Sequence, residues 1–184
     1  MALISKREIL DKADMEIRKK YFTKTASQIL NENYTNISKN NNYDIFLSHS
    51  YQDAKIILGV KKFLEDFKYS VYVDWIEDSK LDRTKVDSNT AALLKMRMKN
   101  CRCLLYVTTD NSSESKWMPW ELGYFDGLKN KVAILPINEI PTNNDLYSGQ
   151  EYLGLYEYIV EDSNELYVYN YGIYGNVFSK WIRE

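Results

Sequence analysis

The chain has 184 residues, of which 45% are hydrophobic, and its formal net charge is −2. This length supports one well-buried core and is too short for two ordinary domains joined by a linker. A net charge so close to zero produces no field that favours nucleic acid or an anionic membrane as a partner.

The N-terminal region carries charged residues soon after Met1. No apolar run there reaches the roughly 7 to 15 residues of a secretory signal, and none reaches the length of a membrane span. We therefore expect a cytoplasmic protein.

Cys101 and Cys103 stand two apart in an apolar run that is typical of a strand. Side chains two apart on a strand share a face, so we expect two reduced core thiols that cannot easily bridge each other. The chain has a single histidine, His49, and lacks further ligands at the spacing that zinc requires. We therefore expect no metal site.

The first predicted element is a helix that begins near Ser5. Ser5 and Glu8 have the spacing of a capping box, and apolar side chains recur at helical spacing in the residues that follow. This apolar stripe must cover another part of the protein. Residues 31–42 are dominated by Asn, Ser, Thr and Lys, which favours a linker. We therefore expect an N-terminal helix and a polar linker over residues 1–42.

From residue 43 short apolar runs alternate with amphipathic stretches. The apolar runs predict buried strands over residues 43–48, 70–75, 101–109 and 132–137. The stretches between them predict helices over residues 53–68, 88–99 and 117–128. This alternation predicts a doubly wound α/β fold, in which a parallel sheet carries helices on both faces.

The C-terminal part is less regular. Residues 165–171 alternate as in a strand, and we interpret residues 173–182 as a closing helix. Eight of the sixteen tyrosines lie after Asp145. A tyrosine-rich end is typical of the amphipathic rim of a core, which we favour here, and also of surfaces where proteins meet.

Polar side chains stand where the predicted strands end. In an open parallel sheet, ligands bind at the carboxyl ends of the strands, where the following helices direct free N–H groups into the crevice. The first strand brings Ser48, His49 and Ser50 to this edge, and the second brings Asp74 and Trp75. Structural roles also remain open: His49 could close the strand, Ser50 could cap the next helix, and Asp74 could cap a turn.

A carboxylate follows on the helix predicted over residues 117–128. Glu121 stands four residues beyond Trp117, so one helical turn places the indole beside the carboxylate. A glutamate on a surface helix is usually a solvated charge, and Trp117 could be a plain core contact. No glycine-rich phosphate loop is present, so a nucleotide would have to be held in another way. A Ser-His-Asp hydrolase is disfavoured, because neighbours on a strand face opposite ways.

Three segments, in this order, resemble the TIR domain family. Residues 43–48 (Tyr-Asp-Ile-Phe-Leu-Ser) look like its first box, residues 70–74 (Ser-Val-Tyr-Val-Asp) fit its second strand, and residues 117–122 (Trp-Met-Pro-Trp-Glu-Leu) look like its Trp-x-x-x-Glu motif. The similarity covers residues 43–137. In its size, the chain is similar to the standalone bacterial TIR proteins of Thoeris anti-phage defence.

The resemblance implies a flavodoxin-like TIR domain over residues 43–184 with an added N-terminal helix. It also implies an enzyme that cleaves the nicotinamide–ribose bond of NAD and needs no cofactor. Glu121 matches the catalytic glutamate of the family, and Trp117 matches its motif partner. Five strand-end residues match the walls of the NAD cleft: Ser48, His49, Ser50, Asp74 and Trp75.

One departure from the family pattern concerns the loop after Asp74. The usual Arg-Asp box with its Pro-Gly type turn is absent, and residues 76–86 read Ile-Glu-Asp-Ser-Lys-Leu-Asp-Arg-Thr-Lys-Val. Arg83 in this loop could meet the phosphates of NAD.

A single carboxylate can suffice for this chemistry. Nicotinamide leaves from a pyridinium and takes the positive charge with it, so its departure needs no proton, unlike that of an ordinary glycoside oxygen. Glu121 could stabilise the oxocarbenium-like ribose by its charge, by accepting from ribose hydroxyls or by brief covalent capture.

Three functions are compatible with these features. The first is an NAD-processing enzyme that self-associates through its TIR domain and makes a cyclic ADP-ribose isomer as an anti-phage signal for a separate effector. The second is a non-enzymatic TIR–TIR interaction module, and the third is a bacterial effector that depletes host NAD. The Trp-x-x-x-Glu motif favours an enzyme over an adaptor, and the lack of a signal peptide favours an internal role. Neither nucleic acid nor a membrane is an expected partner.

Overall fold

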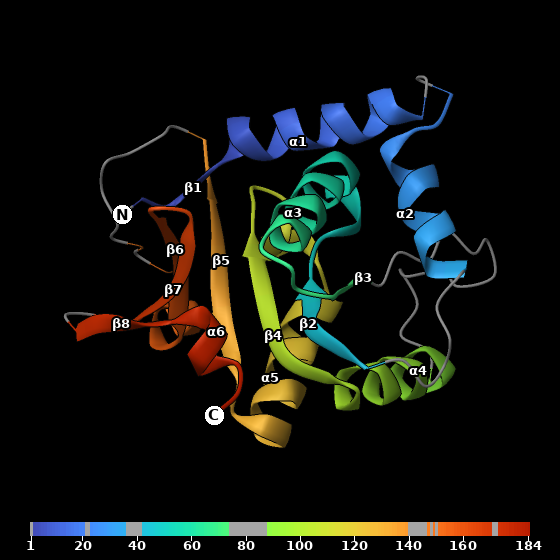
Figure 1. The fold of residues 1–184 in the computed structure, drawn as a ribbon. Coiled ribbons are helices and arrows are strands. Elements are labelled where there is room, and N and C mark those ends of the chain that lie inside the picture. The colour runs from blue at the N-terminus through green and yellow to red at the C-terminus, as the bar shows by residue number, and fades with distance from the viewer. Residues whose placement is uncertain are drawn as a thin grey trace.

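The computed structural model describes residues 2–20, 23–35, 42–73, 88–139, 147, 149, 151–170 and 173–184, except for the side chains of residues 33–35 and 173–174. Within these ranges an eight-stranded sheet carries helices on both faces (Figure 1). None of the helices in the described part is long and apolar enough to cross a membrane.

The central part of the sheet is parallel and contains the strands that the sequence predicts. It consists of β2 (Tyr43–Ser48), β3 (Val71–Val73), β4 (Cys101–Thr108), β5 (Val132–Asn138) and β6 (Glu157–Asp162). The strand order is β3-β2-β4-β5-β6-β7-β8, with β7 (Glu165–Asn170) and β8 (Ile173–Val177) antiparallel at one edge. The order reverses between β2 and β4, so the point where ligands bind in such sheets lies there.

The predicted helices are also present and follow the strands in turn. They are α3 (Ala54–Asp66), α4 (Ser88–Lys99) and α5 (Trp117–Lys129). Short 3-10 turns precede α3 and α5 and lead into β6: η1 (Tyr51–Asp53), η2 (Ser112–Glu114) and η3 (Glu151–Leu155). This order confirms the predicted doubly wound α/β architecture.

Side-chain alternation along the strands divides the core into two layers. The α3 layer packs between the sheet and α3 and contains sheet residues such as Ile45, Leu47, Cys103, Leu105 and Val107. The α5 layer packs between the sheet and α4 and α5 and contains Phe46, Leu104, Tyr106, Ile134 and Tyr158. Strands buried on both faces explain the continuous apolar runs in the sequence.

The N-terminal region is built into the sheet and the α3 layer. It forms β1 (Ile4–Ser5), α1 (Lys6–Lys19) and α2 (Ala26–Thr35), so two helices stand where one was predicted. The first helix begins where expected, although Ser5 makes no side-chain capping bond. β1 pairs with the end of β5, and Ala2 exchanges two backbone hydrogen bonds with Glu161 of β6. β5 and β6 pair with each other only near their starts, and further along the N-terminal segment lies between them and pairs with both.

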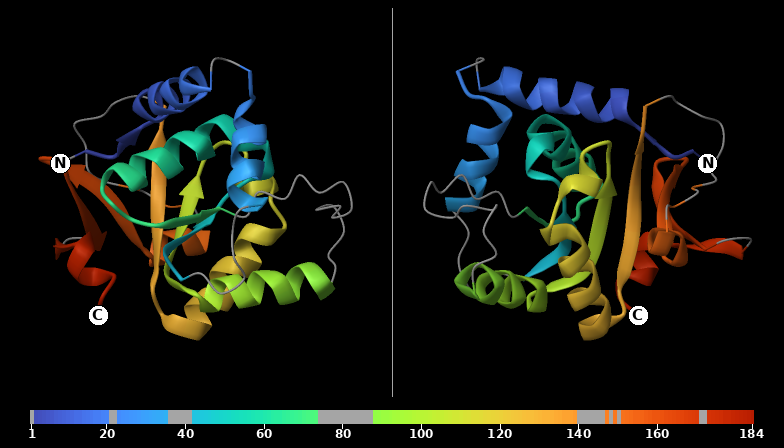
Figure 2. Two further views of the ribbon diagram at one scale, coloured as in Figure 1. Left: turned by 45° about the vertical axis from the view of Figure 1, so that its right-hand side comes forward. Right: turned by 180° about the vertical axis from the view of Figure 1, so that it is seen from behind.

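The apolar stripe predicted for the N-terminal helix covers α3, and Figure 2 shows α1 next to α3 in both views. Ile9 and Ala13 of α1 are fully buried. The approach is so close that a Cβ at Gly59 of α3 would overlap the backbone carbonyl of Ile9. Glycine is therefore required at this position of α3.

Three predictions of the sequence analysis are wrong. The linker predicted over residues 31–42 begins too early, because the helix α2 extends to Thr35. Residues 173–182 form β8 and the short helix α6 (Phe178–Trp181), because Tyr167 and Val168 of β7 pair with residues 177 and 176. The two cysteines also do not share a face: Cys103 belongs to the α3 layer, whereas Cys101, the first residue of its strand, belongs to the α5 layer. Both are free and buried, as expected.

Candidate active site

A row of paired residues crosses the sheet at the level where β2 ends. Ser48 lies beside Tyr106 of β4, Tyr106 beside Ile134 of β5, and Ile134 beside Tyr158 of β6. Tyr106, Ile134 and Tyr158 all belong to the α5 layer. Residues paired side by side on neighbouring strands share a face, so Ser48 also points toward α5.

Glu121 meets Ser48 from the helix above. It stands on the first turns of α5, where Trp117, Met118, Leu122 and Phe125 are also buried, and only 4% of it is exposed. Ser48 Oγ donates a hydrogen bond to Glu121 Oε2 at 2.6 Å. The start of α5 is held by Ser115, whose Oγ accepts from the Met118 N–H at 3.3 Å. The predicted carboxylate therefore points inward to the carboxyl end of β2.

The carboxylate lies in a layer rich in phenol groups. Burial raises the pKa of Tyr106 well above its usual value, and nearby Tyr152, Tyr147 and the charge of Glu121 raise it further. Tyr106 therefore stays protonated at neutral pH and remains a hydroxyl donor. This places a neutral, polar surface next to the Glu121 charge.

Trp117 and Ser50 line the same small pocket. This pocket has a volume of about 240 Å³ and is also lined by Tyr51. Trp117 is 6% exposed, and its indole N–H has no hydrogen-bond partner within the described part of the chain. Buried indole N–H groups usually have a partner, so this donor could serve a bound ligand.

The structural roles left open for His49 and Ser50 are both realised. His49 is buried at the end of β2, with Nδ1 2.9 Å from the carbonyl oxygen of Leu47. Ser50 caps η1, because its Oγ accepts from the Gln52 N–H at 3.4 Å. Ser50 therefore combines a capping role with a place in the pocket wall.

One buried carboxylate was not singled out by the sequence analysis. Asp53 is 5% exposed and accepts hydrogen bonds from Thr109 Oγ1 at 2.5 Å and from Asn111 Nδ2 at 2.7 Å. These bonds tie the start of α3 to the loop after β4. The side chain of Asp53 therefore fixes the loop that follows β4.

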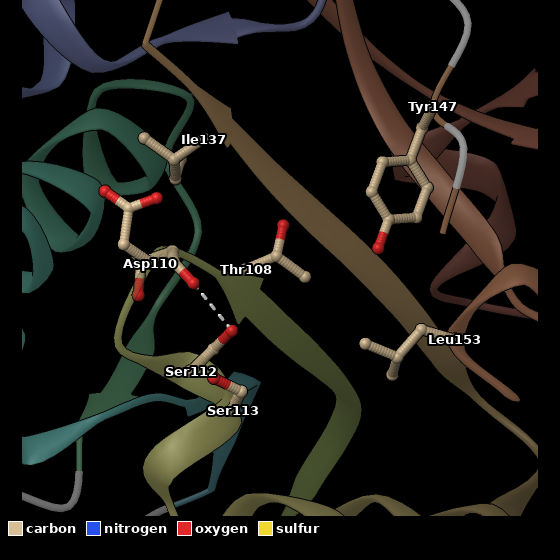
Figure 3. Close-up of a pocket in the computed structure, with 8 residues that line it drawn as sticks. Thr108, Asp110, Ser112, Ser113, Ile137, Tyr147 and Leu153 are labelled. Atoms are coloured by element: carbon tan, nitrogen blue, oxygen red, sulfur yellow. Dashed lines mark hydrogen bonds between the residues drawn. The ribbon is translucent and has the colours of Figure 1, made fainter. Parts of the chain in front are cut away.

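A second pocket, of about 390 Å³, lies at the carboxyl ends of β4 and β5. Figure 3 shows Thr108, Ser112 and Ser113 on one side of it and Tyr147 and Leu153 on the other. Strand-end reasoning could find Thr108, but Tyr147 and Leu153 come from an irregular segment without a local signal. Glu121 is not among the described residues that line either pocket.

Three predicted site residues, Asp74, Trp75 and Arg83, lie outside the described residues. The structure therefore brings together Ser48 with Glu121, and Ser50 with Trp117. Within the described ranges, no three His, Cys, Asp or Glu side chains are grouped so that they could hold a metal ion.

The site thus contains a buried carboxylate at the switch point of a doubly wound sheet. Known proteins with similar sequences indicate the family to which this chain belongs. The family model described as "TIR domain" matches residues 45–163, and the chain belongs to the TIR domain family. The chain is 50% identical over 164 residues to the "Probable 3' cyclic ADP-D-ribose synthase ThsB'" of Bacillus cereus (strain MSX-D12). The aligned region covers 88% of this chain and 84% of that protein.

A second similarity is shorter. Over 90 residues the chain is 39% identical to the "Putative cyclic ADP-D-ribose synthase TIR2" of Cytobacillus dafuensis, covering 48% of this chain and 24% of that protein. Both names refer to the synthesis of a cyclic ADP-D-ribose, and the first specifies the 3' form.

Proposed function

We propose that this protein is an NAD-processing TIR enzyme that releases nicotinamide and makes cyclic ADP-ribose as a signal in defence against phage. The observation that carries the proposal is the buried hydrogen bond between Ser48 and Glu121 at the switch point of the sheet. The names of the two relatives support it, because both are called cyclic ADP-ribose synthases.

In the proposed reaction, the bond between the ribose C1 and the nicotinamide nitrogen breaks. The electron pair leaves with nicotinamide, which becomes a neutral pyridine, and positive charge remains on the ribose. A hydroxyl or ring nitrogen of the adenosine part of the same molecule then bonds to C1, and a proton is released. Atoms and charges balance without an oxidant or a metal.

Glu121 is the catalytic residue of this proposal. Its negative charge would oppose the charge that develops on the ribose, and its burial makes that interaction stronger than it would be in water. Ser48 is a positioning residue, since its hydroxyl holds Oε2 in place. The donor is neutral, so it orients the carboxylate without cancelling its charge.

The rest of the cleft is assigned by the family motifs. We propose that Trp117 and Ser50 line the substrate site, supported by the pocket that they share. His49, Asp74, Trp75 and Arg83 complete the proposed set. The exposed ring of Tyr51 offers a further flat surface at the mouth of this pocket.

The adaptor alternative gives no reason for the burial of Glu121. Taking an ionised carboxylate out of water costs several kcal/mol unless charges or hydrogen bonds compensate for it. A module that works only by assembly gains nothing from such a cost at a strand end. A catalytic carboxylate gains from burial, because its interaction with a developing positive charge is stronger away from water.

Several wider features belong to the same proposal. The enzyme would act in the cytoplasm, assemble with further copies through its TIR domain, and reach a separate effector through its diffusible product. It would need NAD as its substrate and no cofactor.

Product analysis tests the proposed function. The purified protein is incubated with NAD, and the products are identified by mass and chromatography against cyclic and linear ADP-ribose standards. Cyclic ADP-ribose together with nicotinamide is the expected result. If ADP-ribose is the only product, the function is NAD depletion rather than signalling. If NAD is not consumed even at high protein concentration or with crowding agents, the proposal of an NAD-processing enzyme is overturned.

A further inference from the structure

The 390 Å³ pocket at the ends of β4 and β5 has two chemically different sides. Thr108 and Ser113 offer hydroxyl groups on one side, and Tyr147 and Leu153 offer an aromatic ring and an apolar side chain on the other (Figure 3). Its volume lies in the range of small-molecule sites, and its lining is more polar than that of most such sites. A ligand that fits has a flat apolar part and a part with hydroxyl groups.

Tyr147 and Leu153 of this pocket pack on the same face of the sheet as Glu121, whereas Ile137 of the lining packs against the α3 layer. Thr108 stands two residues beyond Tyr106 on β4, so both side chains point to the α5 layer, about 6.6 Å apart along the strand. Tyr106 is the neighbour of Ser48, and Ser48 holds Glu121. The step from Glu121 to the pocket is therefore short. It crosses from β2 to the neighbouring strand β4 and then runs two residues along β4.

The charges around the pocket disfavour a phosphate. None of the described residues that line it is Lys or Arg, and Asp110 brings a negative charge to its rim, with 81% of its side chain exposed. Lys6 lies 3.7 Å from Asp110 and is also hydrogen-bonded to Glu139, so two carboxylates compensate its charge. The pocket suits an uncharged nucleoside, and Asp110 can accept from ribose hydroxyls as acidic residues do in dinucleotide folds.

We propose that this pocket binds the adenosine end of the dinucleotide, with the adenine ring between Tyr147 and Leu153 and the ribose hydroxyls at Thr108 and Ser113. The inference rests on the proposed function and extends it. It gives the pocket a role in deciding the product. Adenosine that is held beside the ribosyl cation reacts as if at very high local concentration, so ring closure outruns capture by water.

Two matched substitutions on η3 test this assignment. Leu153→Trp fills the pocket, whereas Leu155→Trp adds the same ring two residues away, at a position that is 84% exposed. Leu153→Trp should raise KM for NAD about tenfold or more and increase the share of linear ADP-ribose among the products. Leu155→Trp should leave both quantities unchanged.

Nicotinamide mononucleotide separates pocket binding from the chemistry, because it lacks adenosine. Its kcat/KM should be the same in Leu153→Trp as in the wild type. Thr108→Val removes one hydroxyl at nearly constant volume and provides a milder change, and it should raise KM for NAD in the same direction. Equal unfolding midpoints of all variants exclude a folding defect.

Calorimetric titration with adenosine makes the pocket testable apart from turnover. Wild-type protein and Leu155→Trp should bind adenosine, and Leu153→Trp should bind it at least tenfold more weakly. If the protein binds adenosine but does not cleave NAD, the proposed function is wrong and the assignment of this pocket to adenosine still holds. The inference is overturned if NAD is cleaved while Leu153→Trp and Leu155→Trp share the same KM, product ratio and adenosine affinity.

Discussion

Ser48 of β2 and Glu121 of α5 are joined by a 2.6 Å hydrogen bond across 73 positions of sequence, and neither residue is more than 4% exposed. The donor is a neutral hydroxyl, and the bond fixes one oxygen of the carboxylate. The bond also connects the end of β2 to the first turns of α5, which covers this face of the sheet. Orientation of the carboxylate should therefore depend on Ser48.

Replacement of Ser48 by alanine should lower kcat for nicotinamide release by about 10- to 100-fold, the equivalent of one hydrogen bond to a charged group. KM should change little, since Ser48 acts on Glu121 rather than on bound NAD. Ser70→Ala is the matched control, because Ser70 donates to Asp44 at the other end of the sheet. A Ser48→Ala enzyme with wild-type kcat would contradict the positioning role.

Replacement of Gly59 by alanine should destabilise the protein, although alanine is normally the better helix former by about 1 kcal/mol. The added Cβ would meet the carbonyl of Ile9 and force α1 away from α3. Gly127 on α5 is the control, since a Cβ there meets no atom within 4 Å. Denaturant unfolding should show a loss of stability for Gly59→Ala and a gain of up to about 1 kcal/mol for Gly127→Ala. Equal stabilities of the two variants would disprove the close approach of α1 and α3.

The buried thiols should make stability depend on alkaline pH. Burial raises the pKa of Cys101 to about 12 and that of Cys103 well above its usual 9.0. Unfolded thiols lose their protons near pH 9 while the folded ones keep theirs, so the free energy of unfolding should fall as the pH rises from about 9 toward 12. Each thiol contributes at most about 1.4 kcal/mol per pH unit to this fall.

Alkylation gives a second measure of the thiols. Iodoacetamide at pH 8 should leave both cysteines unmodified in the native protein and label both in denaturant, because the thiolate is the reactive form and neither thiol is accessible. Rapid labelling of either cysteine under native conditions would contradict its burial.

Regular periodicity made most of the fold predictable, and non-local contacts account for the misses. The strands and helices from β2 to β5 each have a clear apolar pattern, and each was found within a few residues. β1 has only two residues and carries no local signal. Residues 173–177 become a strand because β7 offers them a partner, and Gly175 lies close against Val168 there. The division at residue 42 stays a prediction.

The predicted site residues remain a prediction, and the structure adds geometry that the sequence did not contain. The strand-end rule and the Trp-x-x-x-Glu motif pointed to Ser48, Ser50, Trp117 and Glu121, which the structure places near the carboxyl end of β2. The bond between Ser48 and Glu121 depends on how α5 is rotated over the sheet, which no local pattern encodes. The bonds of Asp53 to the loop after β4 arise in the same way, from segments distant in sequence.

The central claim is that the Glu121 carboxylate drives nicotinamide release, and the most direct measurement compares three proteins under saturating NAD. Glu121→Gln keeps the shape and the acceptor for Ser48 but removes the charge, and Asp126→Asn removes a charge from the same helix away from the site. We expect nicotinamide release to fall at least about 100-fold in Glu121→Gln and to stay at the wild-type rate in Asp126→Asn. A folded Glu121→Gln protein that releases nicotinamide as fast as the wild type would contradict the claim.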